Sequence, residues 1–269
     1  MNTVALTYMD LALAAALLVV NGIISLAFGL RLERSLIVAA LRMVVQLAAV
    51  GWVLTFVFAQ SSPLWTLLAA AVMVAFAGFE LRQRQNIRVR GWLSFGLGNA
   101  TLLLVGGVAT IYAVAVVIGP EPWYTPRYVL PIFGMVLGNV LTSVSLALQT
   151  LTESVERERT AIEARLALGA TRFVAFSGVL RRALRTATTP LVNAMAVAGV
   201  VALPGMMAGQ ILAGADPGEA AKYQITIMFV LSGASGLGAV AAALGSVLLL
   251  TDRRHRLRAE RLLRSARRS

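Results

Sequence analysis

Cysteine is absent from this sequence, and histidine and lysine occur only once each, as His255 and Lys222. The first absence excludes disulfides, thiolate metal sites and thiol chemistry, and a single histidine excludes a paired-histidine metal motif. Lys222 stands between Ala221 and Tyr223, so the chain lacks the Gly-Lys-Ser/Thr core of a phosphate-binding loop. We therefore expect no catalytic residues and no cofactor in this chain. If the protein uses ATP, another subunit supplies the nucleotide site.

Charged residues are also scarce, at 13% of the chain, whereas 58% of residues are hydrophobic and the mean hydropathy is +0.80. Soluble proteins are about 25% charged. Uncharged runs such as residues 11–30 reach the roughly 20 apolar residues that a helix needs to cross a bilayer. Because backbone groups cannot stay unpaired in lipid, and no barrel-like alternation is present, the sequence predicts an all-α polytopic membrane helix bundle. We expect about seven spans, near residues 8–30, 36–58, 64–80, 93–118, 128–150, 188–213 and 223–250.

Basic residues are unevenly distributed between the loops. Of 24 lysines and arginines, two lie in the first loop, four in the third, seven in the fifth and eight between Arg253 and Arg268. The opposite side holds only Arg127 and Lys222, and Arg42 lies within a span. Because cytoplasmic loops collect lysine and arginine, this alternation places the N-terminus outside and the C-terminus in the cytoplasm. The net charge of +12 thus reflects topology, and we expect no nucleic-acid partner.

The expected organisation is one transmembrane domain over residues 1–252 and a basic cytoplasmic tail over residues 253–269. The first span lacks the basic start and the clear cleavage site of a signal peptide, so we expect it to remain as a span. The tail is expected to lie on anionic lipid headgroups. The sequence therefore indicates a multi-pass protein of the inner, or plasma, membrane.

One cytoplasmic segment is long, residues 151–187 between the fifth and sixth spans. Its first half is rich in helix formers and holds opposite charges four residues apart. We expect Thr152 to cap a first helix, Gly169 to end it and Thr171 to cap a second helix. The segment then forms a helix–turn–helix elbow that projects into the cytoplasm. A solvated loop with charged faces is the alternative, but apolar residues beside the glycine suit docking into a groove; these are Leu166, Leu168, Phe173 and Phe176.

Residues 163–170 read EARLALGA, and Phe176 follows them. This stretch resembles the EAA-type signature of ABC transporter permeases, although Arg165 stands where the third letter is usually alanine. In that family the elbow is the coupling helix, which docks on the ATPase subunit. The resemblance assigns this contact to Glu163, Ala164, Leu168, Gly169, Ala170, Phe173 and Phe176.

A second resemblance lies at residues 203–225, which read LPGMMAGQILAGADPGEAAKYQI. The stretch resembles the hallmark of the FetB-type permeases, which include bacterial iron exporters and plant aluminium-tolerance permeases. Residues 42–47, 134–139 and 190–195 fit the same family. The resemblance implies a permease that pairs with a cytosolic ABC ATPase, usually as two copies of each, with ATP and magnesium bound by the ATPase. It also implies a role in metal homeostasis, and iron export is the activity that it favours over other metal transport.

The same stretch interrupts the expected sixth span. Pro204 removes a backbone donor and Gly205 loosens the chain, so we expect the helix to kink or break before Met206. Breaks in membrane helices are tolerated where they line a cavity, and freed carbonyls then become cation ligands. All three residues, with Met207 and Gln210, are candidates for the translocation pathway. The two methionines are weak metal candidates whose thioethers favour Cu(I), and gap filling is their alternative role.

Three further polar residues are pathway candidates. Arg42 and Gln46 lie on one face of the second span, where a charge is a functional candidate unless it snorkels to the interface. Asn139 is a third candidate, because it lies in the stretch 134–139 that fits the family. Interhelical hydrogen bonding is its alternative role. Asp216 and Glu219 follow the break on the outer side, where they either attract a cation or keep the loop hydrated.

Small residues on the last span offer either a dimer seam or an internal contact; they are Ser232, Gly236, Ala239 and Ala243. Two other function classes remain open beside the ABC permease. A secondary transporter or channel could be driven by an ion gradient through the same bundle. A membrane scaffold could use the elbow to tether a cytosolic partner. The resemblance favours a permease subunit that assembles as a homodimer in the lipid bilayer with a separate ATPase.

Overall fold

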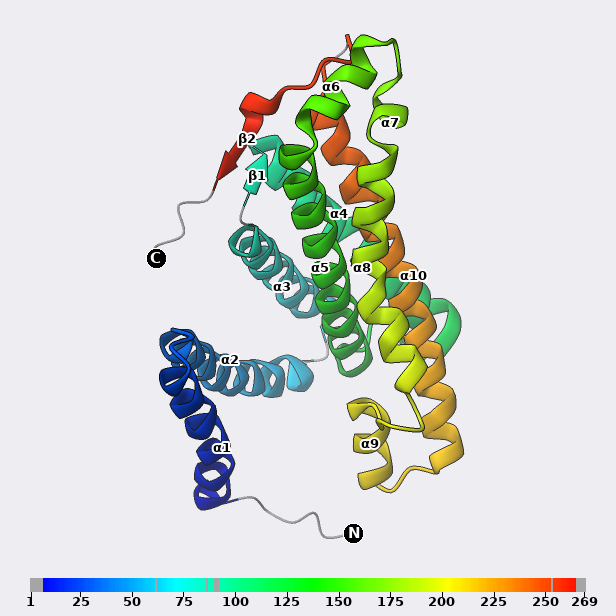
Figure 1. The fold of residues 1–269 in the computed structure, drawn as a ribbon. Coiled ribbons are helices and arrows are strands. Elements are labelled where there is room, and N and C mark those ends of the chain that lie inside the picture. The colour runs from blue at the N-terminus through cyan, green and yellow to red at the C-terminus, as the bar shows by residue number, and fades with distance from the viewer. Residues whose placement is uncertain (1–6, 61, 86, 90–91, 253, 265–269) are drawn as a thin grey trace. The chain divides into compact units, whose positions relative to one another are not determined.

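The computed structural model describes residues 7–60, 62–85, 87–89, 92–252 and 254–264 (Figure 1). The chain divides into two compact units, one of residues 1–61 and 212–214 and the other of residues 62–211 and 215–269. The larger unit contains both the predicted elbow and the break in the sixth span.

Helices make up nearly all of the secondary structure of the described residues. In chain order the elements are α1 (Tyr8–Ala27), α2 (Glu33–Gln60), α3 (Pro63–Arg84), β1 (Ile87–Val89), α4 (Trp92–Ile111), the π-helix η1 (Tyr112–Ile118), α5 (Pro126–Arg157), α6 (Arg159–Ala167), α7 (Arg172–Ala175), α8 (Ser177–Val197), α9 (Gly205–Leu212), α10 (Pro217–Leu250), the 3-10 helix η2 (Ala259–Arg261) and β2 (Leu262–Arg264). The predicted helical membrane bundle is confirmed, with one pair of three-residue strands added to it.

Six of the described helices are long and apolar enough to cross a membrane: α1, α2, α3, α4 with η1, α5 and α10. The sixth expected span, residues 188–213, is divided, because α8 ends at Val197 and α9 begins only at Gly205. α8 also starts inside the expected elbow segment, residues 151–187, and carries three arginines near its beginning. Its apolar stretch before the break is therefore short. The predicted break is confirmed, and it divides the expected span into two helices.

The smaller unit is a helical hairpin of α1 and α2. Ser25 holds the turn between them: its Oγ donates to Glu33 Oε2 at 3.0 Å and accepts from the Leu32 N–H at 2.9 Å. Nearly all other side chains of both helices are exposed. Apolar side chains that face outward on all sides suit helices whose neighbours are lipid chains.

α5 is the centre of the larger unit, and α3, α4, α8 and α10 pack around it (Figure 1). Its buried side chains recur every three or four residues from Phe133 to Val155, which is the period of a helix face turned toward a core. Gly238 of α10 allows a close approach to α5, because a Cβ at this position would lie 2.7 Å from Val140 Cγ1. α5 and α10 therefore form a tightly packed pair.

The small-residue face of α10 is largely internal. Ala239 and Ala243 have no exposed surface, and Ser232 and Gly236 are half-buried. Ala239 belongs to a small cluster with Ala147 of α5. Of the two alternatives for this face, the internal contact is the one that the structure shows.

Three arginine-rich segments meet at one end of the larger unit, here called the basic end. β1, which follows α3, pairs antiparallel with β2 of the C-terminal tail, with Ile87 opposite Arg264. Leu257 and Leu262 of the tail pack on a cluster that the elbow and the ends of α5 and α10 form. α9 lies at the opposite end of α10 (Figure 1). A shared location is what the arginine pattern predicts for these three segments.

The basic tail folds back on the protein, which the sequence did not predict. After α10, Thr251 and Leu257 form an antiparallel bridge, and residues 262–264 form the strand that pairs with β1. Arg253 and residues 265–269 of the expected tail lie outside the described residues. In its described part, the tail is thus built into the basic end of the bundle.

Candidate functional site

The elbow begins later than the sequence predicts. α5 runs without a break to Arg157, so Thr152 lies inside this helix and does not cap a new one. Thr152 is buried, and its hydroxyl bonds to the carbonyls of Leu148 and Gln149 at 2.9 and 3.1 Å. The elbow proper therefore consists of residues 158–176, which connect α5 to α8.

Gly169 ends α6, as predicted. Its φ of +87° lies in the left-handed region, which glycine adopts without a Cβ penalty. The Gly169 N–H donates to the Leu166 carbonyl at 3.0 Å, and the Ala170 N–H donates to the Arg165 carbonyl at 3.1 Å. These two bonds form a Schellman motif, which satisfies carbonyls that the helix end leaves free. The chain turns here, and α7 begins at Arg172.

The elbow carries an exposed apolar surface, the elbow patch, formed by Ala164, Ala167, Leu168, Phe173 and Val174. Leu168 is 88% exposed at the tip, and Phe173 and Val174 are also exposed, at 44% and 60%. Large apolar side chains gathered on a short turn between arginines form the kind of surface that a partner protein covers.

Phe176 does not belong to the elbow patch, so this part of the predicted docking set was wrong. Phe176 is fully buried in a cluster with Leu151, Ile162 and Val179. It therefore fixes the elbow to α5 and α8 instead of contacting a partner. The other predicted docking residues are exposed or half-buried on the elbow: Glu163, Ala164, Leu168, Gly169, Ala170 and Phe173.

The second helix of the elbow is not capped by Thr171, whose side chain makes no capping hydrogen bond within the described chain. His255 of the tail takes this place. Its Nδ1 accepts from the backbone N–H and from the Nε of Arg172, both at 3.3 Å. Arg172 Nη1 also donates to Thr251 Oγ1 at 3.4 Å. Because His255 lies 83 residues further along the chain, no local sequence signal could have found this cap.

The break in the sixth span is wider than a kink. α8 ends at Val197, and the seven described residues 198–204 are not helical. Gly199 adopts a φ of +86° within this segment. α9 then begins at Gly205, and none of its residues is buried in the described structure. Such a segment leaves carbonyls outside the helical ladder, as the ion sites of broken membrane helices require.

Two buried amides lie on the helices that follow the break. Met206 is half-buried and packs on the main core cluster. Gln210 Oε1 is buried and has no hydrogen-bond partner among the described residues. The same holds for Gln224 Oε1 on α10, a residue that is only 9% exposed. A buried polar atom without a partner is costly, so each of these oxygens needs a water, an ion or another polar group beside it. Sequence reasoning missed Gln224, and its signal was a lone glutamine in the apolar run after the break.

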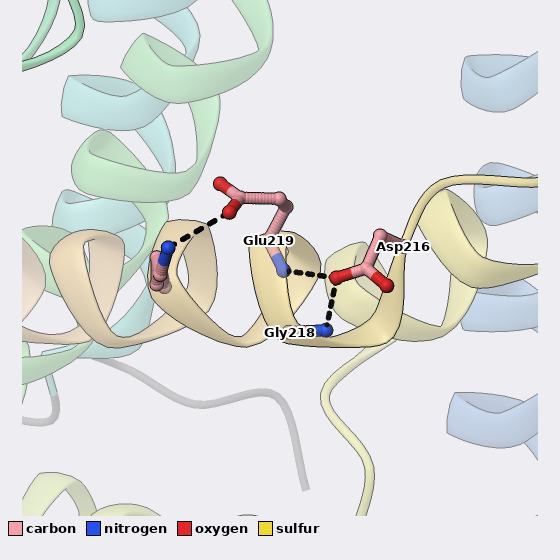
Figure 2. A network of polar contacts seen from close by, with 4 residues as sticks. Asp216, Gly218 and Glu219 are labelled. Carbon is pink, nitrogen blue, oxygen red and sulfur yellow. Dashed lines mark hydrogen bonds and ion pairs between the residues drawn. The ribbon is translucent and has the colours of Figure 1, made fainter.

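The acidic residues after the break make local contacts (Figure 2). Asp216 caps α10, and its Oδ1 accepts from the N–H groups of Gly218 at 2.9 Å and Glu219 at 3.1 Å. Lys222 Nζ donates to Glu219 Oε1 at 2.7 Å. These contacts support a structural role for both carboxylates, in starting the helix and keeping its end hydrated, over attraction of a cation.

The remaining pathway candidates lie in different elements. Arg42 and Gln46 are exposed on α2 in the smaller unit. Asn139 is half-buried on α5, and its Nδ2 donates to the Met135 carbonyl at 2.9 Å, so it is satisfied within its own helix. Met207 is half-buried on α9. The predicted candidates therefore lie in three separate places: Arg42 and Gln46 on α2, Asn139 on α5, and the residues from Pro204 to Gln210 at the break.

An apolar groove of about 700 Å³ lies between α4 with η1 and α10, lined in part by Leu104, Tyr112 and Phe229. Its lining residues, all of them described, include no carboxylate or thioether, so the groove suits an apolar occupant better than a cation. Among the described residues, no three histidine or acidic side chains gather as a metal site would require. Carbonyls, amide oxygens and a thioether near the break are the ligands that the larger unit offers instead.

The fold defines a multi-span α-helical membrane protein. The chain belongs to the UPF0014 family, because the model of this family, described as an uncharacterised protein family, matches residues 8–249. No solved structure matches the chain.

Several curated proteins are similar to this chain. It is 41% identical over 206 residues to a UPF0014 membrane protein of Synechocystis, which covers 76% of this chain and 78% of the relative. It is 35% identical over 229 residues to the protein ALUMINUM SENSITIVE 3 of Arabidopsis thaliana, covering 84% and 82%. It is 32% identical over 257 residues to the probable iron export permease protein FetB of Escherichia coli, covering 96% and 97%. These names fit a transport subunit in an inner membrane, and the family indicated by the sequence motifs is confirmed.

Proposed function

We propose that this protein is the permease subunit of an ABC transporter, which exports iron or another metal cation together with a separate cytosolic ATPase. The family and the relative named as a probable iron export permease support the transport class. The observation that supports an ATPase partner is the elbow patch, an exposed apolar surface on an anchored turn. ATP and magnesium bind in the ATPase, and two copies of each subunit assemble in the bilayer.

The elbow is anchored in a way that transmits force. Buried Phe176 fixes its end to α8, and Arg182 of α8 donates a hydrogen bond to Glu158 at its start. This hydrogen bond from Arg182 holds the pKa of Glu158 below its usual range, so the pair stays charged at neutral pH. A movement of the docked ATPase therefore passes into α5 and α8 instead of bending a loose loop.

α8 connects the elbow to the break. Its 21 residues, at 1.5 Å each, give a length of about 31 Å, and the uncharged part after Arg185, residues 186–197, spans about 18 Å of it. This is less than the roughly 30 Å thickness of the hydrocarbon core, so a tilt of α8 at the elbow displaces a broken segment that lies within the membrane. In the proposed cycle this displacement exposes residues 198–210 to one side of the membrane and then to the other.

The ligands near the break support a cation as the substrate. The carbonyls of residues 198–201 and 203 and the amide oxygens of Gln210 and Gln224 suit a hard cation, because such ions prefer oxygen. The Met206 thioether suits a softer ion such as Cu(I). Iron is proposed first because of the relative's name.

Reconstitution of this chain in nanodiscs with a purified cytosolic ABC ATPase that co-purifies with it tests the docking role. Leu168→Asp places a charge where the partner must bury the elbow patch, so we expect ATPase affinity to fall roughly tenfold or more. Leu30→Asp alters another exposed leucine, in the turn between α1 and α2, where Leu30 is 53% exposed, and should bind as wild type. Unchanged affinity of a folded Leu168→Asp variant would refute docking at the elbow.

Proteoliposomes that contain both subunits test the transport role. We expect ATP-dependent movement of one cation from a panel of iron, manganese, copper and aluminium salts, and the cation that moves names the substrate. Transport that needs an ion gradient but no nucleotide would contradict the proposal and identify a secondary transporter.

A further inference from the structure

We propose that the described part of the C-terminal tail, residues 251–252 and 254–264, is part of the docking surface, so that the ATPase meets a composite face of elbow patch and tail bordered by arginines. The inference rests on the proposed function, because it adds a second element to the contact with the same partner. It predicts a partner surface with an apolar groove for the elbow patch and carboxylates beside that groove.

The tail is joined to the elbow by side chains of both. His255 Nδ1 accepts two hydrogen bonds from Arg172 at 3.3 Å, and Arg172 Nη1 donates to Thr251 Oγ1 at 3.4 Å. Leu257 and Leu262 pack on the same buried cluster that holds the elbow. Polar and apolar contacts together keep the tail next to α7, so a partner that covers the elbow also approaches the tail.

The tail has an ordered structure of its own. Asp252 Oδ1 accepts from the N–H groups of Arg254 and Arg256 at 2.9 and 2.8 Å, and Asp252 Oδ2 accepts from Arg256 Nε at 2.9 Å. The bond from the Arg256 N–H is the main cause that lowers the pKa of Asp252, so the carboxylate stays charged and the turn persists at neutral pH. Arg261 Nη1 donates to the Leu249 carbonyl at 2.5 Å, which ties the tail to the end of α10. The side chains of Arg256 and Arg261 are therefore held in defined positions.

Charge distinguishes the tail from the elbow. Residues 158–176 contain three arginines and two glutamates, whereas residues 251–264 contain six arginines against one aspartate and one glutamate. The elbow is nearly neutral by itself, and the tail makes the composite face basic. Arg254 is exposed, and the side chain of Arg256 is 68% exposed, so both are available to a partner. Exposed charges at the rim of an interface steer the partner and make its binding sensitive to salt.

Charge reversal at Arg254 tests the composite face. Arg254 contributes its backbone N–H to the Asp252 turn, so Arg254→Glu changes the surface charge and keeps this bond. With purified ATPase and the full chain in nanodiscs, we expect affinity to fall about three- to tenfold at low salt and the difference to shrink above about 0.5 M salt. Arg127→Glu reverses an exposed charge at the start of α5 and should bind as wild type.

Two further variants test the connection between tail and elbow. His255→Ala removes the acceptor for Arg172, so we expect weaker ATPase binding although the elbow patch is unchanged. Cysteines at Arg88 and Leu263, which face each other in the β1–β2 pairing, should cross-link on oxidation. The cross-linked protein should bind the ATPase as tightly as wild type, because the tail stays in place during docking. Loss of binding on cross-linking would contradict the inference. This test remains valid even if the His255→Ala variant proves unstable.

The outcomes separate this inference from the proposed function. Wild-type affinity of Arg254→Glu, with weak binding by Leu168→Asp, overturns the composite face and leaves the ATPase partner intact. Wild-type affinity of both variants overturns docking at this end altogether. If Arg254→Glu weakens adhesion to vesicles that contain anionic lipid but leaves ATPase affinity unchanged, the tail serves the membrane surface and the inference is wrong.

Discussion

The two ends of the larger unit are built differently. At the basic end, the elbow, the tail and the ends of α5 and α10 enclose a cluster in which Leu151, Phe176 and Val247 have no exposed surface. At the other end, the fully described helix α9 has no buried residue, and Val200 and Val201 are 92% and 80% exposed. Dense packing marks a region that moves as one body, and sparse packing marks a region that rearranges.

This difference corresponds to the two roles in the proposed cycle. A docking surface must transmit the movement of its partner, so buried side chains have to fix it to the bundle. A translocation pathway must open and close, and tight packing would prevent this. α5 and α10, of 32 and 34 residues, provide the connection between the two ends.

The largest effect is expected from truncation at the packed end. Phe176→Ala removes a fully buried ring and should cost about 3–5 kcal/mol of unfolding free energy, because the cavity cannot collapse completely. Val200→Ala at the open end removes atoms from a side chain that is 92% exposed and should change stability by less than about 0.5 kcal/mol. Thermal and denaturant unfolding in detergent measure both. Similar costs for the two variants would remove the difference between the ends.

A smaller loss is expected in the connection between the ends. Gly238→Ala pushes a Cβ to within 2.7 Å of Val140 and should cost about 1–3 kcal/mol through overpacking of α5 against α10. Gly233→Ala, on the same helix, meets no described atom within 4 Å and should be neutral or slightly stabilising. The melting temperatures of the Gly238→Ala and Gly233→Ala variants measure this difference in stability. A stable Gly238→Ala variant would show that the two helices are not rigidly coupled.

The third comparison uses two glycines with positive φ, one at each end. Alanine at Gly169 or at Gly199 is strained by the left-handed backbone and should cost about 1–2 kcal/mol in either case. Only Gly169→Ala should also weaken ATPase binding, because it distorts the turn that presents Leu168. Gly178→Ala, at an unstrained position with no described atom within 4 Å of its Cβ, is the control. Equal loss of ATPase binding by Gly199→Ala would argue against separate roles.

The smallest change in stability is expected at Gln224. Gln224→Leu replaces a buried amide oxygen that lacks a described partner, so unfolding free energy should stay constant or rise by about 1 kcal/mol. Cation transport should nevertheless fall while ATPase binding remains normal. Gln60→Leu replaces an exposed glutamine of α2 and should affect neither property. Full transport by Gln224→Leu would assign this residue to packing.

Some of this architecture follows from local sequence and some does not. A membrane helix requires about 20 apolar residues in succession, so the bundle could be predicted. Pro204 and Gly205 together predicted a break in the sixth span. Gly169 could be predicted as a helix end because only glycine adopts its backbone conformation freely. The burial of Phe176 depends on side chains from α5, α6 and α8, and the cap by His255 joins segments 83 residues apart. Tertiary contacts of this kind leave no periodic signal in the sequence.

Labelling of introduced thiols tests the central claim that the two ends of the larger unit face opposite sides of the membrane. The chain has no cysteine, so Leu168→Cys on the elbow and Ala215→Cys between α9 and α10 each report one position. With a membrane-impermeant maleimide, we expect Ala215→Cys to react in intact cells and Leu168→Cys to react only after permeabilisation. Reaction of Leu168→Cys in intact cells would place the elbow outside, where no cytosolic ATPase reaches it, and would contradict the account.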